Sequence, residues 1–361
     1  MTNFYFDYKD IFKAPRLALS GKKLMLQTTG LVIGYIGYLI LTYIAYLTSG
    51  FSISETWDNY GLFPIFEFSF SNLIAWVIFA IGAVFFLALW LLTNTAMAKV
   101  TYEQLKGDEF YSAKESVRFL KKHWKTVLLS PLSILFMFLF LVVCGLIVGL
   151  LGKIPYLGEL GFAIFFGLPI FIVALFAVYI IFVLLNSLLL TPAIVGTLKE
   201  DTFETIVQSF STIWNQPGRF FIYTGILGVL AKIASFVFGY FCYRAVELTT
   251  WVCGVFMSDK MYNLIDGGLT YLPYDSSIMN YMTNLFAGIS FSYLIPLPTE
   301  GVALNWSGDM AAFLLGITFI IIGFVIFSYA LAIMSVGQTI SYMIIYKRKE
   351  GENLLERKAE E

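Results

Sequence analysis

The sequence has few charged residues and only three cysteines, and these shortages exclude several classes of protein. Asp, Glu, Lys and Arg make up 13% of the 361 residues, about half of what soluble globular chains carry. So little charge leaves too little polar surface for a soluble fold of this size. Cys144, Cys242 and Cys253 match neither a disulfide framework nor a zinc pattern. We expect buried thiols, with a bond between Cys242 and Cys253 as the alternative.

Histidine is almost absent, which limits metal and cofactor chemistry. The single residue, His123, excludes a haem held by two histidines of this chain and a di-iron site with two Glu-x-x-His motifs. A Ser-His-Asp triad would have to use His123, and the chain has no G-x-S-x-G motif. We therefore expect no catalytic residue, no metal ligand and no cofactor. His123 itself is predicted to lie in solvent or among lipid headgroups.

Hydrophobic residues make up 59% of the chain and come in runs of about 20 or more. Such runs match the roughly 20 helical residues that cross a bilayer of about 30 Å, whereas membrane barrels show alternating segments of about ten residues. The sequence therefore predicts an all-α polytopic membrane bundle of about six helices. Thr191-Pro192 is expected to end or kink the fourth of these helices. The predicted spans are 28–47, 72–97, 127–151, 163–190, 220–243 and a long helix that begins near 310 and continues to about 346.

The distribution of positive charge predicts the orientation of the chain. With the N-terminus inside, nineteen of the 23 Lys and Arg residues lie in inner segments. Only Lys153, Arg244 and Lys260 lie outside, and Lys232 lies within a span. This bias follows the positive-inside rule and places both termini in the cytoplasm, as expected for a bacterial inner membrane protein. The region 244–257 is the weakest part of this topology, since it could be a re-entrant segment.

Two inner segments resemble each other, because each begins with a helix cap and ends in a tryptophan. Ser112 and Glu115 form an S-x-x-E capping box, and Asp201 and Glu204 have the same spacing. Apolar residues recur at helical spacing after both caps, up to Trp124 and Trp214. We predict two amphipathic helices on the inner leaflet, anchored by these tryptophans, each leading into a span. This arrangement suggests an internal repeat, and a third surface helix is predicted outside, near 277–289.

A few intramembrane residues are candidates for special roles. Lys232 lies about twelve residues from either end of the fifth span, close to the bilayer midplane, where lysines usually face an interior or a cavity. Its alternative role is structural, with the side chain extended to the interface or bonded to a main-chain carbonyl. Small residues that let helices approach closely are expected at packing faces within the chain, with packing against a partner's helices as the alternative. These residues are Gly30, Gly34, Gly145, Gly149 and Gly228.

The sequence is treated as one membrane domain over 1–361. Its parts outside the bilayer are predicted to be the amphipathic N-terminal segment 1–27, the surface-helix regions 98–126 and 199–218, the outer region 258–309, and the charged tail 347–361.

The layout of capped surface helices leading into long apolar spans resembles a loose group of uncharacterised bacterial polytopic membrane families. One of these is the membrane domain attached to some glycerophosphodiester phosphodiesterases. The resemblance lies in 12–17, in 112–124 with the span that follows, in 191–214, and in 337–353. It implies a membrane module without assigned activity. The phosphodiesterase domain has no counterpart here, since no soluble stretch is long enough for a catalytic barrel of about 250 residues.

These observations favour a non-enzymatic membrane protein that acts as an accessory or scaffold subunit of a larger membrane complex. Its partners would be membrane lipids and other proteins of that complex, and no feature indicates nucleic acid. The alternative is a lipid-handling or small-solute transport protein with a cavity around Lys232. An intramembrane enzyme is the third class, and it would need a convergent polar cluster that the spans do not contain.

Overall fold

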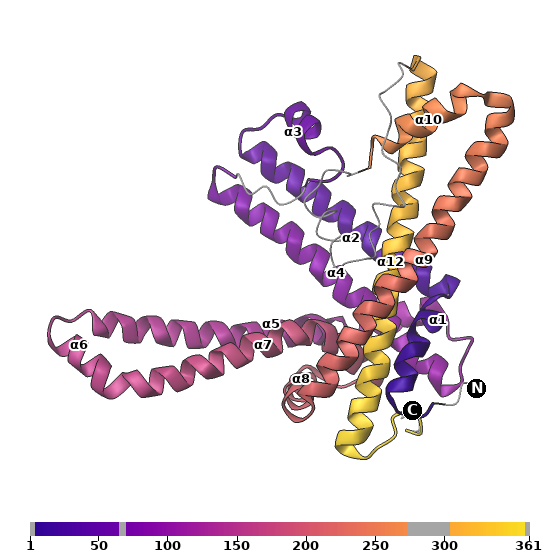
Figure 1. Ribbon diagram of the computed structural model, residues 1–361. Coiled ribbons are helices and arrows are strands. Elements are labelled where there is room, and N and C mark those ends of the chain that lie inside the picture. The colour runs from indigo at the N-terminus through magenta and orange to yellow at the C-terminus, as the bar shows by residue number, and fades with distance from the viewer. Residues whose placement is uncertain (1–3, 65–69, 273–303, 358–361) are drawn as a thin grey trace. The chain divides into compact units, whose positions relative to one another are not determined.

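A computed structural model describes residues 4–64, 70–272 and 304–357 (Figure 1). Every regular element in these ranges is a helix, and six of the helices are long and apolar enough to cross a membrane. The predicted fold class is confirmed, and the chain is a multi-pass integral membrane protein. The six helices are α2 (Gly21–Thr48), α4 (Leu73–Lys106), α5 (Ala113–Gly152), α7 (Gly167–Leu198), α9 (Pro217–Met257) and α12 (Trp306–Glu350).

The chain divides into two compact units, which the sequence prediction of one membrane domain does not distinguish. Unit 1 contains Met1–Ile11, Leu91–Thr224 and Ser335–Glu361, and unit 2 contains Phe12–Trp90 and Gly225–Met334. The helices α4, α9 and α12 each contribute residues to both units. Unit 1 thus contains most of the segments that the charge distribution predicts to lie on the cytoplasmic side of the membrane.

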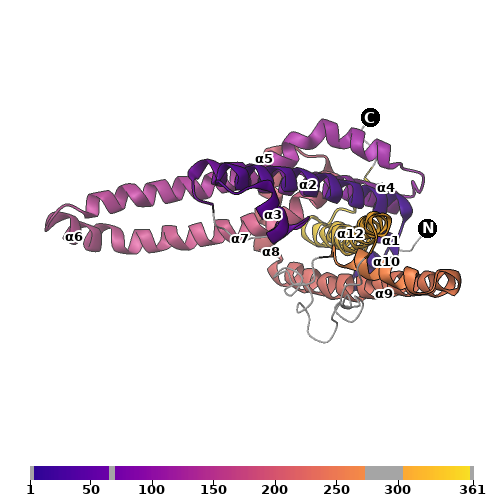
Figure 2. The same cartoon turned by 90° about the horizontal axis from the view of Figure 1, so that it is seen from above.

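A long helical hairpin is the main feature of unit 1. Helices α5 and α7 run side by side and are joined by the short helix α6 (Leu157–Gly161) and the π-helical turn η2 (Phe162–Phe166) (Figures 1 and 2). Helix α8 (Thr202–Asn215) packs against both α5 and α7. Large apolar side chains are exposed along the hairpin, as expected for helices that face lipid.

The two predicted surface helices differ in how they lead into a span. The first is continuous with its span, since α5 runs unbroken from Ala113 to Gly152 and passes through Pro131. The second is separate, because α8 ends at Asn215 and α9 begins with Pro217 at its first position. Gln216, between them, has a non-helical backbone (φ −137°, ψ 49°), as residues before proline usually do. No residue between Trp124 and Val127 has a non-helical backbone of this kind, so α5 is not divided there.

The helix boundaries correct two further expectations. Helix α7 does not end at Thr191-Pro192, since it continues through Pro192 to Leu198. A proline removes only one ladder donor, and the helix continues because its residues from Leu190 to Leu198 are all buried in unit 1. The uncertain region 244–257 is the continuation of α9, which remains helical to Met257. Cys242 and Cys253 are both on α9 as free thiols, about 16 Å apart along the axis and too far for a disulfide.

Close helix contacts determine the packing of unit 2. A Cβ atom on Gly34 of α2 would lie 3.1 Å from Phe86, and one on Gly82 of α4 would lie 3.1 Å from the Cβ of Leu41. The outer region contributes α10 (Asp259–Leu269), where Gly268 approaches α12. The smaller elements are η1 (Tyr8–Lys13), α1 (Ala14–Ala18) and α3 (Ile53–Tyr60). The third predicted surface helix, 277–289, lies outside the described residues.

Candidate functional site

The ends of α4, α7 and α12 form a tightly packed core in unit 1. Gly196 of α7 lies so close to α4 that an added Cβ would be 2.6 Å from the Cβ of Ala98. Helix α12 joins the pair through Ser335, whose hydroxyl donates a 3.1 Å hydrogen bond to the main-chain oxygen of Asn94. Small residues at these positions allow the backbones to approach, as is usual between membrane helices.

The C-terminal segment folds back onto this core. Gly351 ends α12 with a positive φ of 73°, which glycine adopts without steric cost. The chain then passes beside α4, where the Tyr102 hydroxyl donates a 2.8 Å hydrogen bond to the main-chain oxygen of Leu354. The ammonium group of Lys106 bonds the main-chain oxygen of Arg357 at 2.9 Å. The Leu354 side chain is fully buried, so it holds the segment in place.

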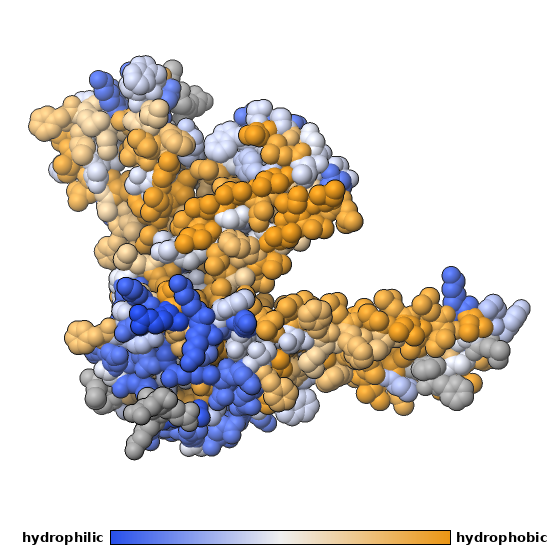
Figure 3. Space-filling view, turned by 180° about the vertical axis from the view of Figure 1, so that it is seen from behind, coloured by the Kyte–Doolittle hydropathy of each residue, from blue (hydrophilic) through white to orange (hydrophobic). Residues whose placement is uncertain are grey.

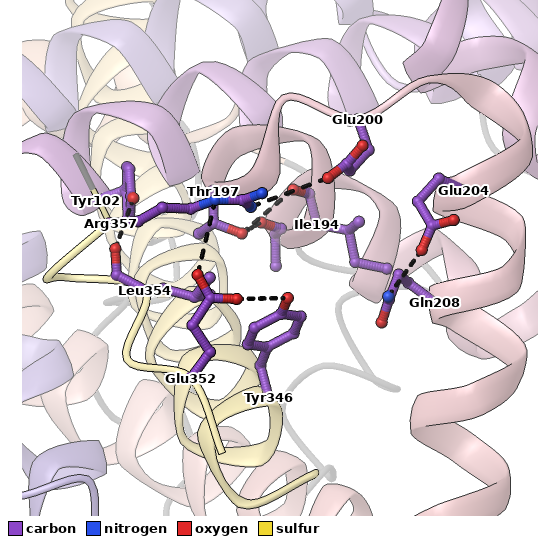
Figure 4. Close-up of polar contacts among 11 residues, drawn as sticks. Tyr102, Ile194, Thr197, Glu200, Glu204, Gln208, Tyr346, Glu352, Leu354 and Arg357 are labelled. Atoms are coloured by element: carbon purple, nitrogen blue, oxygen red, sulfur yellow. Dashed lines mark hydrogen bonds and ion pairs between the residues drawn. The ribbon is translucent and has the colours of Figure 1, made fainter. Parts of the chain in front are cut away.

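Charged side chains connect the tail to the neighbouring helices (Figure 4). The Arg357 guanidinium lies 3.9 Å from the Glu200 carboxylate, between α7 and α8, and 3.8 Å from the carboxylate of Glu352 in the tail. The hydroxyl of Tyr346 in α12 lies 3.4 Å from Glu352. The three charged side chains are partly exposed, so each ion pair contributes little on its own, whereas Tyr346 is buried. Together with the tail contacts they join three segments that are far apart in the sequence.

A second set of contacts joins the end of α12 to α8. The Lys349 ammonium donates to the side-chain oxygen of Gln208 at 2.7 Å and to the Ser211 hydroxyl at 3.0 Å. Asp7, near the N-terminus, lies 3.8 Å from Arg348. Burial raises the pKa of Tyr111, on the loop before α5, to about 12, and nearby carboxylates add to this effect. The contacts fasten segments that the positive-inside rule places on one side of the membrane.

The core also contains buried polar atoms without a hydrogen-bond partner among the described residues. Such atoms cost free energy when they are left unpaired. All of them belong to the parts of α4, α7 and α12 that lie in unit 1. The atoms are Oδ1 of Asn94, Oε1 of Gln104 and Gln338, and the hydroxyls of Thr191, Ser341 and Tyr342.

Both helix caps are confirmed by the structure. The Ser112 hydroxyl accepts from the Glu115 amide at 3.2 Å, and Glu115 accepts from the Ser112 amide in return. Asp201 accepts from the Glu204 amide at 2.9 Å. Beyond the caps, small hydroxyl residues form the buried face of α8, namely Thr205, Ser209 and Thr212.

The predicted interfacial tryptophans both lie on exposed faces. Trp214 of α8 is 72% exposed and contacts the ring of Tyr179 on α7, and Trp124 of α5 is 47% exposed. The apolar residues Phe203 and Val207 of α8 are exposed as well. An exposed apolar stripe opposite a buried hydroxyl face suits a helix that rests on a lipid surface.

Lys232 of α9 is nearly buried, at 8% exposure, and it is not without a partner in the structure. Beside it, the Ser235 hydroxyl donates to the main-chain oxygen of Ala231 at 2.6 Å. Two hollows identified in the structure, of about 500 and 180 Å³, lie in the α5–α7 hairpin and are not lined by Lys232. A cavity around Lys232 therefore stays a prediction.

The small residues predicted at packing faces differ in their surroundings. Gly34 lies in the close approach between α2 and α4, and Gly30 and Gly228 are half-buried. By contrast, Gly145 and Gly149 of α5 are exposed, and a Cβ on either would meet nothing within 4 Å. The G-x-x-x-G face of α5 is therefore open in unit 1.

The comparisons with protein-family models, with curated proteins and with solved structures found no match to this chain. Among the described residues, no group of three or more His, Cys, Asp or Glu side chains is placed to hold a metal ion. The proposals below therefore depend on the geometry of the chain itself.

Sequence reasoning missed the residues that hold the tail. Tyr102, Leu354 and Arg357 carry no motif, and their partners lie up to 252 residues away. It also missed Lys23 of α2, whose side chain is fully buried and bonds the main-chain oxygen of Leu17 at 2.9 Å. The available signal was the run of small and apolar residues at the end of α7, over 188–198.

Proposed function

We propose that this chain is a non-enzymatic scaffold subunit of a larger membrane complex, and that a partner's transmembrane helix docks on the α5–α7 hairpin. The observation that carries the proposal is the open G-x-x-x-G face of α5, at Gly145 and Gly149. In lipid, apolar bulk alone does not bring helices together, and faces of small residues are the usual contact surface. A glycine in a helix interior also lowers the stability of the helix by about 1 kcal/mol relative to alanine.

The remainder of the hairpin suits such a role. Its large apolar side chains point outward on both helices, and Phe140 of α5 is 66% exposed. Figure 3 shows hydrophobic side chains along the arm formed by the hairpin, with hydrophilic side chains gathered beside its base. The base of the hairpin contains the two helix caps, α8 and the C-terminal tail with its hydrogen bonds. These polar elements hold one end of the hairpin in place.

The orientation belongs to the same proposal. We place the polar core of unit 1 and both termini in the cytoplasm of a bacterium, with the chain in the inner membrane. The support is the excess of Lys and Arg in the segments that meet there. A scaffold with this orientation offers the hairpin to membrane partners and the polar core to the cytoplasm.

The test combines gentle extraction, native mass spectrometry and a matched pair of variants. Gly145→Leu/Gly149→Leu adds bulk to the open face, and Val143→Leu/Ile147→Leu changes a different exposed face of the same helix. We expect a stoichiometric partner on the unaltered chain, its loss in the glycine variant, and its retention in the control.

Two results would contradict the proposal. If the chain is isolated without a partner and neither variant alters its assembly, no partner helix docks on the hairpin. A glycine variant that lowers the thermal stability of the isolated chain would show that the face packs within the chain itself.

A further inference from the structure

The first three to four turns beyond the α5 cap carry a dense set of positive charges. Five basic residues fall within twelve positions, and all of them are exposed. The one carboxylate among them, Glu115, is engaged in the capping box. Trp124, which favours the membrane interface, is 47% exposed on the same segment. The five cations are Lys114, Arg118, Lys121, Lys122 and Lys125.

Further along the same helix lies an apolar groove between α5 and α7. It has a volume of about 500 Å³. Phe136 and Phe140 line it from α5, and Phe176 and Ile180 line it from α7. The one polar residue in its wall is Ser133. The groove opens on the exposed apolar surface of the hairpin, so a lipid chain can enter it from the side.

The helical register aligns part of the basic set with this groove. An α-helix has 3.6 residues per turn, so residues eighteen apart differ by five full turns and share a face. Arg118 stands eighteen residues before Phe136, and Lys122 stands eighteen before Phe140. Because α5 is continuous over these positions, both cations lie above the groove. Lys114 and Lys121 are rotated from Arg118 and Lys122 by roughly 40–100°, toward the flank of the helix that lies farther from the groove residues.

The spacing along the axis also fits one lipid molecule. Lys122 and Ser133 are separated by about 16 Å at 1.5 Å per residue. One leaflet with its headgroups is roughly 20 Å deep. A headgroup phosphate beside Lys122 therefore leaves the acyl chain at the level where the groove begins.

We propose that this face of α5 binds an anionic phospholipid, with the headgroup phosphate on Arg118 and Lys122 and an acyl chain in the groove. Positive charge on the helix complements the phosphate, and the groove continues from it into the lipid-facing surface. The arginine forms paired hydrogen bonds to phosphate oxygens, which a lysine cannot replace. This site is separate from the open glycine face and does not depend on the proposed scaffold function.

The test uses the full chain in mild detergent and native mass spectrometry with added lipid. Phosphatidylglycerol and phosphatidylcholine with the same acyl chains are compared, and glycerol phosphate serves as the free anion. We expect phosphatidylglycerol to remain bound, phosphatidylcholine to bind at least tenfold more weakly, and glycerol phosphate not to compete. Arg118→Gln/Lys122→Gln should lower phosphatidylglycerol retention about thirtyfold, in line with the usual effect of two basic residues at an anionic surface.

Matched variants distinguish lipid binding at this site from general attraction to the positive charge of the helix. Lys114→Gln/Lys121→Gln removes the same charge from the flank of the same helix that lies farther from the groove residues, and retention should fall much less than in the Arg118→Gln/Lys122→Gln variant. Ser133→Phe fills the groove without changing any charge and should weaken phosphatidylglycerol binding. Phe140→Ala, which removes a groove wall without adding bulk, is the second groove variant if Ser133→Phe does not fold.

Three results would overturn the proposal. If both charge variants lose the same amount of bound phosphatidylglycerol, the lipid is attracted by the total positive charge of the helix and not by a site. Equal retention of the two lipids would show that the groove takes acyl chains without regard to charge. Competition by glycerol phosphate, with no effect of the groove variants, would identify a site for a free anion.

Discussion

The hydroxyl of Tyr102, in α4, donates a hydrogen bond of 2.8 Å to the main-chain oxygen of Leu354, 252 residues later in the chain. This bond closes the C-terminal segment over the end of α4, and the buried Leu354 side chain anchors it. The contact turns the end of a charged tail into a structural part of unit 1.

Tyr102→Phe removes this hydrogen bond while it preserves the ring. The expected loss of stability is about 1–2 kcal/mol, because the Leu354 carbonyl would be left buried without a donor. Limited proteolysis should show faster cleavage after Gly351, and thermal unfolding in detergent should shift downward. Tyr5→Phe, a change of the same kind at an exposed tyrosine, is the control. Unchanged proteolysis would show that the tail is held by other contacts.

Gly196→Ala tests the close approach of α7 and α4. The new Cβ would lie 2.6 Å from the Cβ of Ala98, so the helices must move apart. We expect destabilisation of about 1–3 kcal/mol, typical of overpacking in a tight core. Gly145→Ala, at an open helical position, should be neutral or stabilising because alanine favours helix. Equal melting temperatures for the two variants would contradict this packing.

The caps give a third prediction. Asp201→Ala removes the acceptor for the Glu204 amide at the start of α8, and the usual cost is about 1 kcal/mol. Hydrogen exchange should accelerate in the first turn of α8 and remain unchanged in α5, where Ser112 caps the helix. The reciprocal variant, Ser112→Ala, should show the opposite pattern. Exchange that rises in both helices would indicate that the caps are not independent.

Membrane orientation is tested by labelling single cysteines in a cysteine-free background. Lys114→Cys and Glu356→Cys lie in segments that meet in unit 1, and Asp58→Cys lies on the acidic helix α3 that follows α2. In sealed inverted vesicles, an impermeant maleimide should label the first two positions and leave the third unlabelled. Labelling of all three, or of Asp58→Cys alone, would refute the proposed topology.

Local chemistry predicted the architecture well. The length of the apolar runs determines the six helices, and the side chains of Ser112 and Asp201 start α5 and α8 where the caps indicated. The expectation that the helix ends at Thr191-Pro192 was wrong, since α7 continues to Leu198 and burial in the core outweighs one missing hydrogen bond. The end of α7 packs against α4, where Gly196 approaches Ala98, and no local window of the sequence contains both segments.

The candidate sites show the same limit. Periodicity places Arg118 and Lys122 on one face of α5, and this follows from the sequence once the helix is known to be continuous. That continuity is a structural result, because the sequence alone suggested a separate surface helix before the span. The partner of Tyr102 depends on how the tail folds back, which requires the positive φ at Gly351 and a packed core to receive Leu354.

The unbroken course of α5 has a mechanical consequence. Forty residues of helix extend about 60 Å, twice the roughly 30 Å of the hydrocarbon core, so α5 is too long to lie wholly within that core. Its N-terminal part carries the cations and contacts α8, and its C-terminal part forms the hairpin with α7. Since the helix is continuous through Pro131, its charged N-terminal part and the hairpin belong to one element. A tilt of the charged part is therefore passed on to the hairpin.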